Sequence, residues 1–211
     1  SCFATTVAAL NSAERMARAV REICEDQKKI GVNKTELRFA PHIHGVDAKE
    51  MVDAATSALD NDTNVILCGL YGENPKTFEL LVDMAKNNDR VVGIDIAGGP
   101  KVTDKYGLHH YIDAFVEAKK YGIGRTAHLG EGRPPEEIID GIISLHLQRI
   151  GHGCSLLQSP RAFDLVKDRK IVIEACPTSN MHTGIYKRPS EHPIKRWIEK
   201  GIRVSVCADN S

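Results

Sequence analysis

The chain has 211 residues, of which 42% are hydrophobic and 27% are charged. This composition supplies a sizeable core for one globular domain and excludes a largely disordered chain. Lysine plus arginine equals aspartate plus glutamate at 28 each, so no global field favours nucleic acid or an anionic membrane, and we expect a small-molecule substrate.

Short apolar runs alternate with amphipathic stretches along the chain. The runs predict seven strands, at 36–40, 64–70, 91–97, 124–128, 149–152, 171–176 and 202–208. Helical patterns cover 7–30 and lie near 47–60, 75–87, 109–121, 135–147, 160–168 and 192–200. This alternation predicts a parallel α/β protein. Polar groups at the ends of many strands, rather than at one crevice, favour a TIM-type (β/α)8 barrel over an open sheet.

A closed barrel of this type needs eight strands, one more than the seven predicted. The chain starts inside a helical pattern and stops just after a strand, whereas such barrels usually run to about 250 residues. We therefore expect residues 1–211 to form a single (β/α) barrel domain that is truncated at both ends.

The six cysteines include no CxxC pair, and four lie in or beside predicted strands. We interpret them as buried, reduced thiols of a cytoplasmic protein. No apolar run approaches the roughly 20 residues of a membrane helix, and residues 1–30 lack the apolar region of a signal peptide. We expect neither a membrane nor a nucleic-acid partner.

Imidazole and carboxylate groups follow three of the predicted strands. His128 ends the predicted strand 124–128, and Glu131 follows three residues later in the turn at Gly130. His152 lies between two glycines, which let its ring approach a ligand, and Asp209 follows 202–208. Buried parallel strands present polar groups at their carboxyl ends, so these side chains are expected to converge. Two imidazoles and two carboxylates there are the ingredients of a metal-assisted hydrolase.

Each of these residues also has a plainer interpretation. His128 alone fits a hydrogen-bonded structural histidine, His152 fits a turn histidine, and Asp209 fits the cap of a following helix. His42 and His44 have the alternation of zinc ligands, but they follow a proline outside the apolar run, so we favour a solvated loop. Phosphate-loop, GxSxG and HExxH motifs are absent from the sequence.

Six ordered segments resemble the adenosine deaminase family, and together they span nearly the whole chain. They are ELRFAP at 36–41, GIDIAG at 93–98, RTAHLGE at 125–131, RIGHG at 149–153, CPTSN at 176–180 and ADN at 208–210. The resemblance implies a metal-dependent amidohydrolase of the (β/α)8 barrel fold. It also implies zinc-dependent hydrolytic deamination at C6 of an adenine nucleoside, which converts adenosine to inosine and ammonia.

The resemblance further implies a role for each candidate residue. His128 is expected to ligate zinc, and Asp209 to ligate zinc and to take a proton from its water. Glu131 is expected to donate a proton to purine N1. His152 is expected to orient and support the attacking hydroxide.

Substrate contacts are implied at Gly98, whose backbone N–H would meet purine N3, and at Asn210, which would face N7. The family's first strand carries a His-x-His pair that residues 1–30 lack, so we expect this segment alone to be inactive. Leu129 stands where alanine is usual, and Tyr71 where arginine is frequent. The substrate therefore stays open among adenosine, adenine and N6-modified AMP, with a non-catalytic purine-binding or signalling relative as the alternative.

Overall fold

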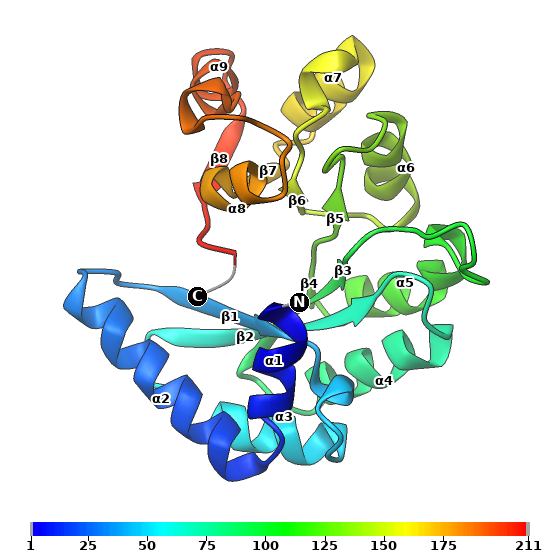
Figure 1. Ribbon diagram of the computed structural model, residues 1–211. Coiled ribbons are helices and arrows are strands. Elements are labelled where there is room, and N and C mark those ends of the chain that lie inside the picture. The colour runs from blue at the N-terminus through cyan, green and yellow to red at the C-terminus, as the bar shows by residue number, and fades with distance from the viewer. Residues whose placement is uncertain (1, 210–211) are drawn as a thin grey trace.

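The computed structural model describes residues 2–209, in which helices and strands alternate (Figure 1). Every strand pair is parallel, and the strands form two sheets with the orders β1-β2-β3-β4 and β5-β6-β7-β8. The predicted parallel α/β class is confirmed. The strands are β1 (Thr35–Phe39), β2 (Thr63–Leu70), β3 (Val91–Ala97), β4 (Gly124–Arg125), β5 (His128–Leu129), β6 (Arg149–His152), β7 (Val172–Ala175) and β8 (Arg203–Val206).

Most of the helices lie outside the strands (Figure 1). Within residues 2–209, none is long and apolar enough to cross a membrane. The α-helices are α1 (Cys2–Ala9), α2 (Ala13–Lys29), α3 (Ala48–Ser57), α4 (Pro75–Lys86), α5 (Ile112–Lys120), α6 (Glu136–Ser144), α7 (Pro160–Asp168), α8 (Pro177–His182) and α9 (Ile194–Glu199). Short 3-10 turns are η1 (Pro41–Ile43), η2 (Leu108–Tyr111), η3 (Leu156–Gln158) and η4 (Pro189–Glu191).

The two sheets continue one another through the run that contains β4 and β5. The N–H of Thr126 donates to the carbonyl of Ile94 at 3.1 Å, and the N–H of Gly151 donates to the carbonyl of Ala127 at 2.9 Å. We predicted one strand over 124–128, but the structure divides it, because its first half pairs with β3 and its second half with β6. Each strand thus neighbours the next along the chain, as in a (β/α)8-type barrel.

One helix prediction needed correction, and one helix was missed. The pattern over 7–30 is two helices, because the Ser12 hydroxyl accepts a hydrogen bond from the N–H of Arg15 at 3.3 Å and starts α2 there. Helix α8 was not predicted, although Pro177 stands at its first turn, where proline is favoured. This short helix follows β7 directly and supplies a side chain to the candidate site.

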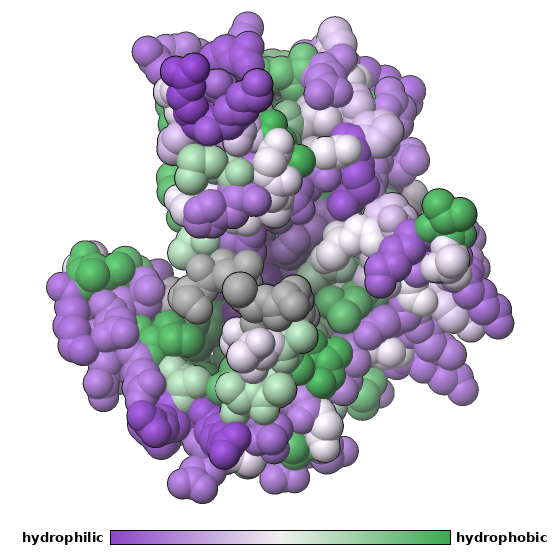
Figure 2. Space-filling view, viewed as in Figure 1, coloured by the Kyte–Doolittle hydropathy of each residue, from purple (hydrophilic) through white to green (hydrophobic). Residues whose placement is uncertain are grey.

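An aromatic cluster holds α4 and α5 to the first sheet. The ring of Phe78 lies 4.2 Å from that of Tyr111 and 6.2 Å from that of Phe115, measured between centroids. A Cβ at Gly69 on β2 would lie 2.4 Å from Phe78, so glycine is required for this close approach. Hydrophilic residues cover most of the face in Figure 2, and hydrophobic residues form small separate groups there.

Replacing Phe78 with alanine should lower the free energy of unfolding by about 3–5 kcal/mol, because the fully buried ring would leave a cavity. Leu80 on the same helix is 45% exposed, so Leu80→Ala should change it by less than about 0.5 kcal/mol. Urea unfolding followed by circular dichroism measures both. Equal losses in the two variants would contradict this account of the core.

Candidate active site

The histidines and the aspartate singled out in the sequence lie at the carboxyl ends of strands of the second sheet. His128 is on β5, His152 ends β6, and Asp209 follows β8. The ring centroids of His128 and His152 are 5.0 Å apart. A Cβ at Gly151 would lie 3.3 Å from the Cα of His128, so this glycine permits the close approach of β5 and β6. The structure therefore brings the two imidazoles together.

Glu131 lies in the loop after β5 and is held by α8 and by His152. Its Oε2 is 3.6 Å from Nε2 of His152. The amide Nδ2 of Asn180 donates to Oε1 of Glu131 at 3.1 Å and contacts Nδ1 of His152 at 3.0 Å. The Thr183 hydroxyl donates to the same Oε1 at 3.4 Å. Three side chains thus fix the position of the carboxyl group.

The contacts of Asn180 define the tautomer of His152. An amide NH₂ only donates, so Nδ1 of His152 accepts, and the ring proton lies on Nε2, which faces Glu131. Burial, and then the nearby His128, lower the pKa of His152. Sequence reasoning gave Asn180 no role, because the turn that begins with Pro177 was not recognised as a helix.

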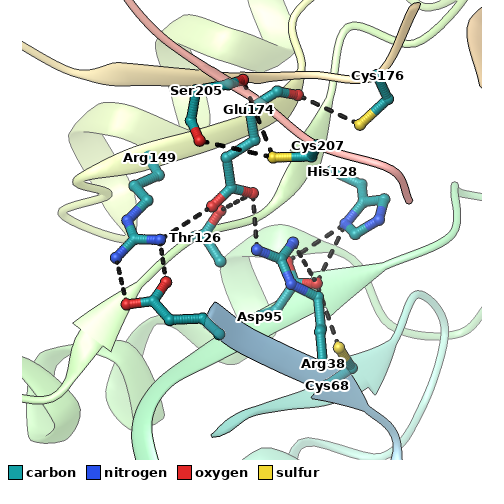
Figure 3. Close-up of polar contacts among 11 residues, drawn as sticks. Arg38, Cys68, Asp95, Thr126, His128, Arg149, Glu174, Cys176, Ser205 and Cys207 are labelled. Carbon is teal, nitrogen blue, oxygen red and sulfur yellow. Dashed lines mark hydrogen bonds and ion pairs between the residues drawn. The ribbon is translucent and has the colours of Figure 1, made fainter. Parts of the chain in front are cut away.

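His128 is oriented by a buried aspartate on β3 (Figure 3). Its Nδ1 lies 3.2 Å from Oδ2 of Asp95, which is fully buried and also accepts from Arg38 at 3.2 Å and from the Cys68 thiol at 3.3 Å. Burial alone would raise the pKa of Asp95, but His128 and Arg38 hold it well below its usual range. Metal-binding histidines usually donate one ring N–H to a carboxylate in this way, which leaves the other nitrogen for the metal.

A group of possible metal ligands lies beside these histidines. One possible ligand atom from each of His152, Cys176 and Asp209 lies within 4.8 Å of the others. Within residues 2–209, this is where three histidine, cysteine or carboxylate side chains come close enough to share a metal ion. His128 is outside that group, although its charge interacts with that of Asp209. Imidazole nitrogen and carboxylate oxygen are donors that zinc prefers, so His128 and Asp209 fit this metal.

The predicted substrate contacts are the backbone of Gly98 and the side chain of Asn210. Gly98 follows β3 with φ at +73°, and a Cβ built on it would meet no atom within 4 Å, so its backbone borders open space. Asn210 lies outside the described residues. Neither contact is tested by these observations.

Glu137 on α6 anchors the loop that carries His128 and Glu131. Its carboxylate accepts from the N–H of Gly130 at 2.8 Å, from the Tyr71 hydroxyl at 3.1 Å and from Nε of Arg133 at 2.9 Å. Nη2 of Arg133 donates in turn to the carbonyl of His128 at 2.6 Å. The Tyr71 hydroxyl is therefore held by the same carboxylate that anchors this loop.

The segment with His42 and His44 is not the solvated loop that we favoured. It forms the turn η1, in which Nε2 of His42 lies 2.8 Å from Glu73 and His44 is buried. Burial lowers the pKa of His44. Nδ1 of His44 lies 3.4 Å from the carbonyl of Val7, so both histidines have structural partners.

A family model described as adenosine deaminase matches residues 1–211. The chain belongs to the adenosine deaminase family. An adenosine deaminase from Clostridium acetobutylicum is 32% identical to it over 219 residues, which cover 99% of this chain and 65% of that protein. This chain thus spans less than two thirds of the length of that family member.

Solved structures of deaminases share the fold. Adenine deaminase from Arthrobacter aurescens has a TM-score of 0.87 at 21% identity, over 98% of this chain and 65% of that one. N6-methyl-AMP deaminase from Arabidopsis thaliana has a TM-score of 0.81 at 23% identity, over 94% and 63%. An amidohydrolase from B. ambifaria, solved with bound Zn, has a TM-score of 0.78 at 22% identity, over 95% and 59%. The barrel fold of this chain is thereby confirmed.

Glu137→Gln should weaken the loop anchor, because the amide group cannot accept all three hydrogen bonds with the strength of a carboxylate. We expect faster hydrogen exchange at the N–H of Gly130 and a loss of about 1–3 kcal/mol in unfolding free energy. The exposed neighbour Glu136 makes a matched control, and Glu136→Gln should leave both quantities unchanged. Unchanged exchange at Gly130 in Glu137→Gln would contradict the anchor.

Proposed function

We propose that the protein deaminates an adenine nucleoside at C6 by metal-assisted hydrolysis, with zinc as the metal. The observation that supports this most is the meeting of His128, Glu131, His152 and Asp209 at the carboxyl ends of barrel strands in a chain of this family. Barrel enzymes keep their chemistry at that end. Residues 1–211 are proposed to act as one barrel domain.

The proposed metal ligands are His128 and Asp209. Bound zinc would supply a water whose pKa falls toward about 7, so that hydroxide is available near neutral pH. Asp95 fixes the His128 ring through Nδ1, which leaves Nε2 as the ligand atom. The Asp209 carboxylate is proposed both to bind the metal and to accept the proton of the attacking water.

Glu131 is the proposed proton donor to purine N1. Asn180 and Thr183 both donate to its Oε1, so Oε2 is the oxygen that remains for the proton. Proton transfer needs a donor held at hydrogen-bond distance from the reacting atom. His152, with its proton on Nε2, is proposed to orient and electrostatically support the oxygen that attacks C6. Protonation of N1 makes C6 more electrophilic, and transfer of the proton taken up by Asp209 to the amino nitrogen would let that nitrogen leave as ammonia.

The proposal is tested by ammonia release from adenosine, adenine and N6-methyl-AMP by the full-length protein, together with its zinc content. Turnover of adenosine above the other two supports an adenine nucleoside as substrate. Preference for adenine or for N6-methyl-AMP would place the activity with a related aminopurine. Purine binding without ammonia release from any of the three would support the non-catalytic alternative.

Glu131→Gln should keep nucleoside binding and reduce kcat by about 10²–10⁴-fold, because the amide cannot donate an acidic proton. Glu79 on the outer helix α4 is an exposed glutamate, so Glu79→Gln should retain normal kcat and KM. Steady-state ammonia release measures both variants. An unchanged kcat in Glu131→Gln would remove the proton-donor role.

In the full-length protein, Asp209→Ala should lower bound zinc from about one equivalent to well below it, because it removes one of the two ligands proposed within residues 1–211 and catalytic zinc sites usually have at least three protein ligands. The exposed Asp168 at the end of α7 provides the control, and Asp168→Ala should retain the metal. Zinc is measured by atomic emission after dialysis. Full zinc content in Asp209→Ala would exclude the ligand role.

A further inference from the structure

A cavity of about 680 Å³ lies at the amino ends of the barrel strands. Its lining includes Arg125 on β4, Gln148 just before β6, Ile171 just before β7 and Arg203 at the start of β8. The candidate active site lies at the carboxyl ends of the same parallel strands. The cavity is therefore at the opposite end of the barrel and is not part of that site.

The charged groups that line this cavity are of one sign. The lining contains arginine, lysine and histidine side chains and, within the described residues, no aspartate or glutamate. The basic residues are Lys119, Arg125, His146, Arg149, Arg169, Lys170 and Arg203. In a chain with zero formal net charge, this is a local concentration of positive charge.

Most of these cations have no carboxylate partner. Arg149 pairs with Glu36 at 2.9 Å and with Glu174 at 3.5 Å. Within residues 2–209, no ion pair involves the other arginines and lysines of the lining: Lys119, Arg125, Arg169, Lys170 and Arg203. Their charge is therefore available to a ligand.

Arg125 is the most buried of these unpaired cations, at 9% exposure. Its Nε donates to the carbonyl of His146 at 2.9 Å and its Nη1 to that of Ile123 at 2.6 Å, while Nη2 has no partner within the described residues. Burial lowers the pKa of Arg125. Burial, and then Lys119, Arg125 and Arg169, lower the pKa of His146. The charges of Lys119, Arg125 and Arg169 therefore all act on His146 in this cavity.

Helix dipoles explain only part of this cluster. Lys119 and Arg169 lie at the ends of α5 and α7, where cations compensate the negative end of the helix. Arg125 and Arg203 lie on strands, which carry only small dipoles. Helix dipoles therefore do not account for the placement of Arg125 and Arg203.

Two of the helix-ending turns that line the cavity carry basic residues at backbone positions where glycine is preferred. His146 and Lys170 follow the C-caps of α6 and α7 with φ at +52° and +55°, whereas Gly122 and Gly201 hold the equivalent positions after α5 and α9. The left-handed backbone is costly for residues other than glycine. The basic side chains are thus present despite a backbone cost.

We propose that this cavity binds a small, multiply charged phosphate-bearing anion of the oligophosphate class. Its volume lies within the range of about 300–1,000 Å³ typical of small-molecule sites. Guanidinium and ammonium groups are the usual partners of phosphate oxygens, and several unpaired cations around one cavity match several negative charges. The ligand would bind remotely from the candidate active site.

The test is calorimetric titration of the purified protein with inorganic tripolyphosphate. We expect saturable binding that weakens as ionic strength rises. Adenosine should not displace the anion, since the two sites are at opposite ends of the barrel. Displacement by adenosine would place the anion in the candidate active site and overturn the proposal, as would the absence of binding. None of these readouts depends on deaminase activity.

Two variants locate the site. Arg203→Gln and Lys170→Gly should each weaken tripolyphosphate binding by roughly tenfold, because each removes a charge-assisted contact. Glycine suits the backbone at position 170, so Lys170→Gly should retain the melting temperature. Lys34, which pairs with Asp62 at 2.8 Å just before β1, is the control, and Lys34→Gln should bind normally.

Equal weakening in the control and in both variants would show nonspecific attraction and overturn the proposal. Vesicles that contain anionic phospholipid form a further arm of the experiment. Binding to the vesicles without binding to free tripolyphosphate would also overturn it, because the proposed ligand is a small soluble anion.

Discussion

A half-buried arginine joins the two sheets across the interior of the barrel. Nη2 of Arg38, on β1, donates to Glu174 on β7 at 2.8 Å, and its Nη1 donates to Asp95 on β3 at 3.2 Å (Figure 3). Burial alone would lower the pKa of Arg38, but the two carboxylates raise it. Leaving one member of a buried ion pair without its partner costs about 3–5 kcal/mol. The three charges therefore constrain the positions of β1, β3 and β7 together.

The candidate site depends on this constraint through a shared oxygen. Oδ2 of Asp95 lies 3.2 Å from Nη1 of Arg38 and 3.2 Å from Nδ1 of His128. A shift of β1 would therefore alter the orientation of the His128 ring. The second imidazole, His152, is set by different contacts, with Asn180 of α8 and Glu131 of the loop after β5. The two halves of the site are thus fixed by two separate networks.

Much of the fold could be predicted from local pattern. The apolar runs indicated the strands to within a few residues, because strands buried on both faces consist mainly of apolar side chains. The division of 124–128 into β4 and β5 depends on which neighbour each half pairs with, and no local pattern encodes that choice. The break at Ser12 was readable as a helix cap, and the amphipathic pattern on both sides concealed it.

The sequence by itself determined the family and the candidate residues, because the order and spacing of the segments around His128, His152 and Asp209 are properties of the chain. Only the tertiary structure decided which side chains support them. The partners of Arg38 are 57 and 136 residues away along the chain, and Asn180 is 49 residues from Glu131. Contacts over such separations exist only after the parallel strands have curved into a barrel, because that curvature brings distant strand ends to a common rim.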